Sequence, residues 1–582
     1  MAEAPKRRRA AAAKRAASET GWFRPWHFAA VLVVLGFVLY VPAMHGPFVL
    51  DDYDMIEGFS AVRSAEWGPV IRSGRPLLML SFIANHRLAG GFHPFPFHVT
   101  NALLHGFNGI LVWLLVGAIF DKAVLSERVR AFRSLFVYGL PLLFVVSPIQ
   151  TESVAYISSR SEVLSATFYF AGMLAFVRLR DRNPWWTAIA VMLCFVGAAM
   201  SKQDKLTLPF AVLLLDYLLM SGCDWRGLKK SWPMYGLFGA GIVAGFFIVV
   251  RPFLFAKTAG FSLDWQEYLF TQFRVVFRYM RQALVPIGLN VDPDIPGSQS
   301  LADHLSWLAL LGLLALVGAA LWFHRRAPLA AFGLLFFLLV LAPTTTFFPL
   351  ADFAAERRLY IPVFGLYLAL LWLTTRVFEP GASGARWALA GVVALYSIGT
   401  FQRSAVWGNE VRLWSDAVAK SPNKERPWTW LGRAQYTAGN IPQAQISWNR
   451  AAELVEKGSE QEAFLLGNLG LMEAQAKRWD QAIAYYKRAL EIKPNETTLW
   501  AQLAVAQIRA GRPEEGWETF DKGEKAWAVI SPQYHFLRGQ EYFQIGEYAK
   551  AAADFQIALN SQPDDEETRR NLEIAKRAAG IQ

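Results

Sequence analysis

Two adjacent carboxylates, Asp51 and Asp52, follow the first long apolar run of the chain. A carboxylate at a lipid–water boundary can act as a general base that takes the proton of an attacking hydroxyl group, or it can bind a metal ion. The same pair can also do no more than end a membrane helix. Which interpretation holds depends on the other charged residues expected on the same side of the membrane.

Several such residues lie near the ends of apolar runs, where the positive-inside rule gives no reason for them. Arginine and lysine there suit a phosphate at the headgroup level, because arginine offers a planar fork and lysine a point charge. Binding of ordinary lipid headgroups and local ion pairs, such as Glu356 with Arg358, are the alternatives. His98, Asn101 and His105 are spaced to share one helix face, and we interpret His105 as a satisfied core residue. The charged residues and histidine of this set are Arg75, His98, Glu152, Arg160, Glu162, Lys202, Asp204, Arg278, Glu356, Arg357 and Arg358.

The composition of the chain is that of a membrane protein joined to a soluble helical domain. Of 582 residues, 54% are apolar and 18% charged, and the long apolar runs are confined to residues 26–402. The net charge of +11 does not indicate nucleic-acid binding, because the basic residues lie mainly in the N-terminal tail and in short loops between apolar runs. Cys194 and Cys223 indicate neither a metal site nor a disulfide framework.

The apolar runs predict a polytopic, all-α membrane domain over residues 26–402, after a basic cytoplasmic tail over 1–25. About eleven runs approach the length of a membrane span. Five alternate loops between them carry arginine or lysine, which predicts that these loops are cytoplasmic. An odd number of spans places the C-terminal domain on the other side, whereas the segment 262–286 is predicted to lie at the interface as an amphipathic helix. The predicted spans are 26–44, 97–119, 135–149, 161–178, 185–200, 206–221, 233–251, 305–323, 328–343, 360–378 and 387–402.

The C-terminal region, residues 403–582, contains an internal repeat. Small residues, aromatic residues and prolines recur with a period of about 34 residues, which is typical of tetratricopeptide (TPR) repeats. Four units follow residue 426, a partial unit precedes them, and 564–579 is predicted to cap the stack. Such a stack commonly binds a peptide or protein, and the alternative is a rigid spacer without a ligand.

The order of these motifs resembles a known family. The segments 51–52, 98–105, 148–162, 201–204, 274–290 and 356–360, together with the repeats, resemble the transmembrane-and-TPR protein O-mannosyltransferases and their bacterial relatives, of the GT-C class of glycosyltransferases. The resemblance implies a polyprenyl-phosphate-linked sugar donor and a serine or threonine acceptor on an exported protein that the repeats recruit. It also implies that Asp51 or Asp52 is the catalytic base. The implied phosphate ligands are Arg75, Arg160, Lys202, Arg278, Arg357 and Arg358.

Gln203 departs from the family pattern, in which an acidic residue is more common. The small number of repeats favours a bacterial protein of the inner membrane, with its TPR domain in the periplasm. The sequence has no βαβ pattern that would bind a nucleotide sugar. A lipid or polysaccharide acceptor, or a non-enzymatic membrane-anchored scaffold for envelope assembly, are the alternative functions. No cofactor is implied with certainty, and a divalent metal near Asp51 and Asp52 stays an open alternative.

Overall fold

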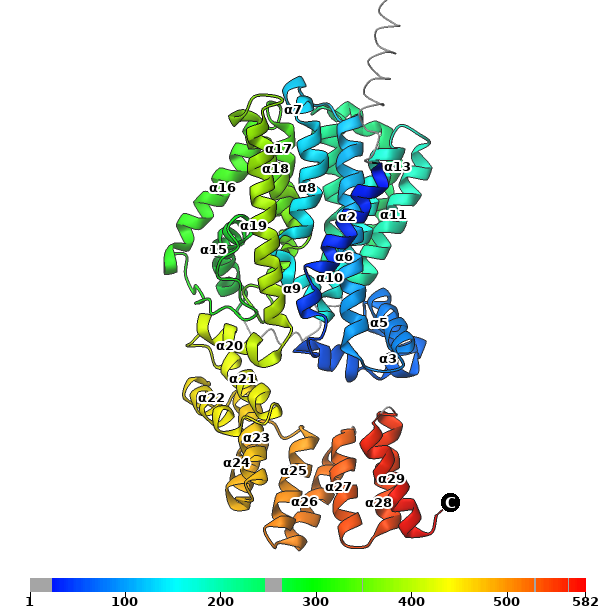
Figure 1. The fold of residues 1–582 in the computed structure, drawn as a ribbon, viewed down its shortest axis with the longest axis vertical. Helices are drawn as coiled ribbons and strands as arrows, with labels where there is room; N and C mark the ends of the chain where they lie inside the picture. The colour runs from blue at the N-terminus through cyan, green and yellow to red at the C-terminus, as the bar shows by residue number, and fades with distance from the viewer. Residues whose placement is uncertain (1–23, 246–263, 348, 528–529, 564, 582) are drawn as a thin grey trace, which may run out of the picture. The chain divides into compact units, whose positions relative to one another are not determined.

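The computed structural model describes residues 24–245, 264–347, 349–527, 530–563 and 565–581. These residues form helices joined by turns, without a β-strand in the described ranges (Figure 1). The chain divides into two compact units, residues 1–409 and 410–582. The predicted tail over 1–25 lies almost entirely outside the described residues, as does the end of the predicted span 233–251.

The first unit consists mainly of long apolar helices that pack side by side. Short helices and single turns connect them, and most of the candidate site residues lie in or beside these connections. The long helices are α2 (Pro25–Val38), α5 (Pro76–Ala89), α6 (Pro94–Lys122), α8 (Arg133–Val146), α10 (Arg160–Leu179), α11 (Pro184–Ser201), α13 (Trp232–Gly245), α15 (Trp265–Leu284), α16 (Ser306–Phe323), α17 (Pro328–Ala342), α18 (Pro362–Val377) and α19 (Ser383–Trp407). The short helices are α3 (Ser60–Ser64), α4 (Trp67–Arg72), α7 (Glu127–Ala131), α9 (Thr151–Ala155) and α12 (Leu208–Leu215).

Fewer helices are long and apolar enough to cross a membrane than the sequence predicts. Six helical segments of the described residues meet this criterion, or seven if the pair Arg133–Val146 and Pro148–Ala155, bent by 48°, is one span. The predicted span 206–221 is instead the short helix α12 followed by a π-helical turn over Asp216–Met220. Hydropathy alone does not detect such breaks, because the residues on both sides are apolar. As predicted, α15 is not among the candidate spans.

Three of the predicted basic loops meet at one end of the first unit. Lys122, at the end of α6, donates from Nζ to the carbonyl oxygen of Arg178 at 3.0 Å. Arg128, in α7, donates from Nε to the carbonyl oxygen of Thr375 at 2.6 Å. These contacts join the end of α6 to the end of α10, and α7 to the end of α18.

The other two basic loops lie at the same end. Lys230 lies 3.8 Å from the carboxylate of Asp181, in the loop after α10. The ring of His324, in the turn between α16 and α17, stacks on Tyr217 with ring centroids 6.0 Å apart. Figure 1 shows α7 and the turn between α16 and α17 at this end, away from α3, α5 and α9. We call it the basic-loop end.

The second unit is a stack of paired helices, and it has the predicted number of repeats. Four pairs match the four predicted units, α20 corresponds to the partial unit, and α29 forms the cap. The helices are α20 (Glu410–Lys420), α21 (Glu425–Thr437), α22 (Ile441–Leu454), α23 (Glu460–Gln475), α24 (Trp479–Ile492), α25 (Thr497–Arg509), α26 (Pro513–Ala526), α27 (Pro532–Gln544), α28 (Tyr548–Ser561) and α29 (Glu566–Ala579).

Glycines bring the two helices of a repeat close together. A Cβ atom on Gly432 would lie 2.4 Å from the ring of Trp448, and one on Gly470 would lie 2.6 Å from the ring of Tyr486. Both distances are too short for any side chain. The aromatic ring therefore fills the space that the glycine leaves, which is the packing expected from the repeat pattern.

Candidate active site

The two adjacent aspartates point to different surroundings. Leu50 has φ of 50°, a left-handed conformation that a bulky residue rarely adopts and that is often found at functional sites. Beyond it, Asp52 is fully buried while Asp51 is exposed. Within the described part of the chain, the Asp51 carboxylate has no hydrogen-bond or ion-pair partner. The pair is therefore not one bidentate acidic group, and only Asp51 is open to solvent.

Asp52 holds the first loop onto the start of α10. Its Oδ2 accepts from the backbone N–H of Val49 at 3.0 Å, and its Oδ1 accepts from the backbone N–H of Ser158 at 2.7 Å. The hydroxyl of Ser158 donates to the same Oδ1. Burial raises the pKa of Asp52 to about 7, although these three hydrogen bonds lower it in part. Asp52 thus links the first loop to the segment before α10, and its carboxyl group changes its protonation state near neutral pH.

Tyr156 connects Asp51 to a cation. The backbone N–H of Asp51 donates to the Tyr156 hydroxyl at 2.8 Å. The guanidinium of Arg357 lies 5.7 Å from the centre of the Tyr156 ring. Sequence reasoning missed Tyr156 because an uncharged aromatic residue stands out less than the charged residues around it. Its position inside the motif 148–162 was the only indication.

Arg357 is held by a buried carboxylate. Glu152, which is fully buried, accepts from Arg357 Nη1 at 2.5 Å and from the Arg357 backbone N–H at 3.3 Å. The carboxylate of Glu152, opposed by burial, keeps the pKa of Arg357 above its ordinary value. The Arg357 side chain keeps 23% of its surface exposed. It is therefore a cation with a fixed position and a free edge.

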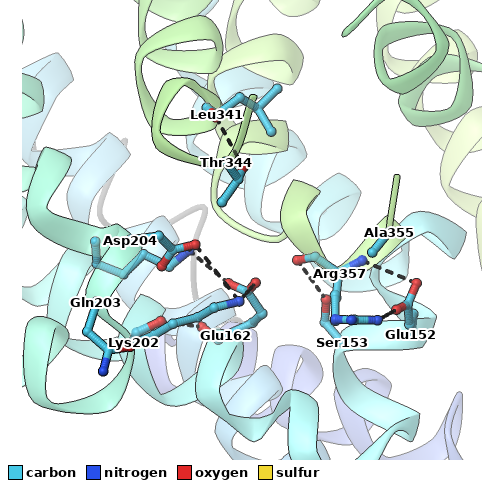
Figure 2. A network of polar contacts seen from close by, with 12 residues as sticks. Glu152, Ser153, Glu162, Lys202, Gln203, Asp204, Leu341, Thr344, Ala355 and Arg357 are labelled. Atoms are coloured by element: carbon cyan, nitrogen blue, oxygen red, sulfur yellow. Dashed lines mark hydrogen bonds and ion pairs between the residues drawn. The ribbon is translucent and has the colours of Figure 1, made fainter. Parts of the chain in front are cut away.

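A second charged group lies at the junction of α11 and the turn Gln203–Thr207 (Figure 2). The buried Glu162 accepts from Lys202 and, at 2.8 Å, pairs with Lys205. Asp204 lies 3.0 Å from Lys205 and 3.8 Å from Lys202. Burial lowers the pKa of Lys202, whereas Asp204 and Glu162 hold the pKa of Lys205 above its ordinary value despite burial. Figure 2 shows this group opposite the Glu152–Arg357 pair.

Lys205 was not among the predicted site residues, although it contacts two residues that were. Its side chain is only 2% exposed, compared with 16% for Lys202. Lys205 is therefore the buried cation shared by Glu162 and Asp204, while Lys202 is the lysine of the group that solvent can reach.

Two predicted phosphate ligands are used inside the protein, which corrects their predicted role. Arg160 is fully buried, and its guanidinium donates to Asn101 Oδ1 at 2.7 Å and to the carbonyl oxygen of Phe97 at 3.0 Å. Arg358 is also buried and donates to the carbonyl oxygens of Asp352, at 2.7 Å, and Phe353, at 3.1 Å. A guanidinium bonded in this way fixes backbone segments and does not face a ligand.

Arg75 and Arg278 stay accessible. Arg75 donates from Nε to Gln203 Oε1 at 3.1 Å, so the residue that departs from the family pattern here orients an arginine. Arg278 is half-buried, and no hydrogen bond or ion pair of its side chain occurs among the described residues. Glu356, which accepts from the backbone N–H of Asn290 at 2.5 Å, contributes to the electrostatic environment of Arg278.

The two histidines have structural surroundings. His98 lies 3.1 Å from the carbonyl oxygen of Gly46 through Nε2, which anchors the first loop. His105 is fully buried and bonds to the Tyr360 hydroxyl at 2.8 Å and the Val145 carbonyl at 3.0 Å, which confirms the core interpretation. Within the described ranges, no group of three or more His, Cys, Asp or Glu side chains is arranged to hold a metal ion.

The repeats alone, and most of the chain, have recognisable relatives. Three family models described as tetratricopeptide repeat match residues 425–495, 473–526 and 502–566. The human protein O-mannosyl-transferase TMTC4 is 24% identical over 499 residues, covering 71% of this chain and 64% of that protein. The mouse protein O-mannosyl-transferase TMTC3 is 22% identical, covering 86% of this chain and 58% of that protein.

Similarity to these proteins is broad but distant. The Drosophila melanogaster protein O-mannosyl-transferase Tmtc1 is 30% identical over 200 residues, or 32% of this chain and 22% of that protein. This chain spans less than two thirds of the length of each relative. Among solved structures, the APC/C hetero-tetramer Cut9–Hcn1 aligns over 90% of this chain and 96% of that chain at 14% identity, but its TM-score of 0.25 is too low to indicate a shared fold.

Fold and comparisons together define a class: a multi-pass helical membrane protein with a unit of TPR repeats. Within that class, the chain is distantly similar to the TMTC-like protein O-mannosyl-transferases.

Proposed function

We propose that this protein is a membrane glycosyltransferase that moves a sugar from a polyprenyl-phosphate donor to a serine or threonine hydroxyl of an exported protein. The observation that carries the proposal is the exposed carboxylate of Asp51, whose backbone is bonded to Tyr156 beside Arg357. A free carboxylate next to a fixed cation is the arrangement that proton removal and phosphate departure both require. The distant similarity to protein O-mannosyl-transferases supports the same activity.

In the proposed reaction, Asp51 takes the proton of the acceptor hydroxyl. The hydroxyl oxygen attacks the anomeric carbon of the sugar, and the bond between that carbon and the phosphate oxygen breaks. The electron pair of this bond leaves with the polyprenyl phosphate. We assign the base to Asp51 because the Asp52 carboxylate already accepts three hydrogen bonds from Val49 and Ser158.

The accessible cations are the proposed ligands of the departing phosphate. Four cations are half-buried: Arg75, Lys202, Arg278 and Arg357. By contrast, the guanidinium groups of Arg160 and Arg358 donate to backbone carbonyl oxygens. Charge that develops on a leaving phosphate is best stabilised by donors that are already in position. Glu152 supplies that positioning for Arg357, and Glu162 supplies it for Lys202.

The proposed topology follows from the basic-loop end. Positive loops stay on the cytoplasmic side, so the opposite end, which bears Asp51, faces away from the cytoplasm. The full prediction of about eleven spans requires α12, α13, α18 and α19 to cross as well. For a bacterial protein, this arrangement corresponds to the inner membrane, with the TPR unit in the periplasm where it recruits the acceptor.

The test uses the full-length chain, reconstituted in liposomes with polyprenyl-phosphate mannose carrying a radiolabelled sugar. Asp51→Asn is expected to lower transfer by about 100-fold or more, the contribution of a general base. Asp54→Asn is the matched control, since Asp54 is also exposed and lies three residues further along. Equal activity of Asp51→Asn and the control would refute the assignment of the base. Label in the lipid fraction, with none on protein, would refute the protein acceptor.

A further inference from the structure

A cavity lies at the basic-loop end, far from the residues of the candidate active site. Its volume is about 420 Å³, and it is an open groove bordered by α16, α17 and the end of α18. Two arginines, Arg326 and Arg376, line it together with apolar residues. The apolar residues that matter here are Ala319, Phe323, Ala330 and Trp372.

The cavity exists because α16 packs against α17 much less extensively than α17 packs against α18. α17 and α18 pack backbone to backbone, and a Cβ on Gly333 would lie 2.4 Å from the carbonyl oxygen of Gly365. By contrast, only 11% of the apolar stretch of α16 is buried. The sharp turn at His324–Ala327 joins α16 to α17 but leaves the space between them open. A groove bounded by membrane helices and floored by alanine is accessible to lipid chains and unfavourable for a free ion.

Both arginines of the cavity are available to a ligand. Neither side chain has a hydrogen bond or ion pair among the described residues, and both are exposed. The guanidinium of Arg376 lies 4.7 Å from the centre of the Trp372 ring. Stacking on the ring fixes the plane of the guanidinium while its N–H groups stay free at the edge. Together with the exposed guanidinium of Arg326, this fork at an apolar groove is complementary to a phosphate attached to a hydrocarbon chain.

We propose that this cavity binds an anionic phospholipid, with the phosphate between Arg326 and Arg376 and an acyl chain along Ala319, Phe323 and Ala330. Phe323 is 47% exposed, so apolar surface is present for that chain to cover. Basic pockets between membrane helices are a known form of anionic headgroup site. The lipid joins α16 to the packed pair α17–α18 and thereby adds to the limited direct contact between α16 and α17.

The test measures lipid binding to the full-length chain in detergent by native mass spectrometry. Phosphatidylglycerol and phosphatidylcholine with identical acyl chains are titrated in parallel, and phosphatidylglycerol is expected to bind more tightly. Arg326→Gln and Arg376→Gln are each expected to weaken phosphatidylglycerol binding about fivefold, the contribution of one basic residue near an anionic headgroup. Arg325→Gln is the matched control, because Arg325 is the neighbouring residue but does not line the cavity.

A second variant tests the contribution of the apolar groove to lipid binding separately from that of the arginines. Ala319→Trp fills the groove from the exposed face of α16, and it is expected to weaken the binding of both lipids without removing a charge. Equal losses for Arg325→Gln and Arg326→Gln would overturn the proposal, as would equal affinity for the two lipids. Displacement of the lipid by millimolar inorganic phosphate would also overturn it, since the site would then bind the ion alone. A dimer that forms regardless of lipid would identify a second copy of the chain as the occupant.

Discussion

Ionisation of Asp52 should make the stability of the protein fall as the pH rises, which is opposite to the usual behaviour of an aspartate. Its pKa is about 7 in the folded protein, against 3.8 for an unperturbed carboxyl. Between these two values the folded chain binds a proton that the unfolded chain has lost. Raising the pH therefore favours the unfolded state. Integrating over about pH 5 to pH 8 gives a loss of about 2–3 kcal/mol.

The assay is the apparent Tm of the detergent-solubilised full chain, followed by tryptophan fluorescence at one heating rate from pH 5 to pH 8. Asp52→Asn removes the titrating group, so its Tm should be less dependent on pH than that of the unmodified protein. The difference between the two curves cancels the titration of every other group. Asp54→Asn, an exposed neighbour, should follow the unmodified protein.

Parallel curves for Asp52→Asn and the unmodified protein would refute the reasoning. They would mean that the hydrogen bonds from Val49 and Ser158 offset the cost of burying the charge. The carboxylate would then be ionised throughout, and Asp52 would have no special response near neutral pH.

Two further predictions concern packing away from Asp51. Lys205→Met should destabilise the protein by about 3–5 kcal/mol, because Glu162 stays buried with one of its two cations removed; an unchanged Tm would mean that Lys202 alone neutralises it. Gly470→Val should destabilise the TPR unit by about 1–3 kcal/mol through overpacking against the facing tyrosine ring. Circular dichroism during thermal unfolding tests this, and loss of the transition of the membrane unit instead would contradict the separation into two units.

The repeats were the part of the fold most accessible to sequence reasoning. Each unit encodes its own packing within about 34 residues. Gly432 and Trp448, for example, belong to one helix pair and meet directly. Residues that form the repeat pattern are therefore the same residues that contact each other in the structure. The number of helix pairs followed from the number of repeats.

The membrane unit was predicted less completely, because its breaks depend on tertiary contacts. The π-helical turn at Asp216 interrupts an apolar run, and the Asp216 carboxylate accepts from Arg180 Nε at 2.8 Å and from the Tyr235 hydroxyl at 2.7 Å. Neither partner is close in sequence. A hydropathy profile detects the apolar run but not these hydrogen bonds.

Candidate site residues were found by charge, but their roles were not. Glu152 and Arg357 are separated by 205 residues, so their pairing cannot be read from local spacing. The same limit explains why Arg160 and Arg358 were grouped with the phosphate ligands. Whether an arginine faces a ligand or the backbone depends on carbonyl groups that only the folded chain brings near it.

The four charges around Glu162 have one more consequence. Two lysines and two carboxylates cancel, so the resting cluster carries no net charge. Because nearby carboxylates already balance the charge of Lys202, an anion binds to it less strongly than to an unpaired ammonium group. Under the proposed function, this arrangement limits how long the spent carrier lipid stays bound, and fast turnover is obtained at the expense of tight retention.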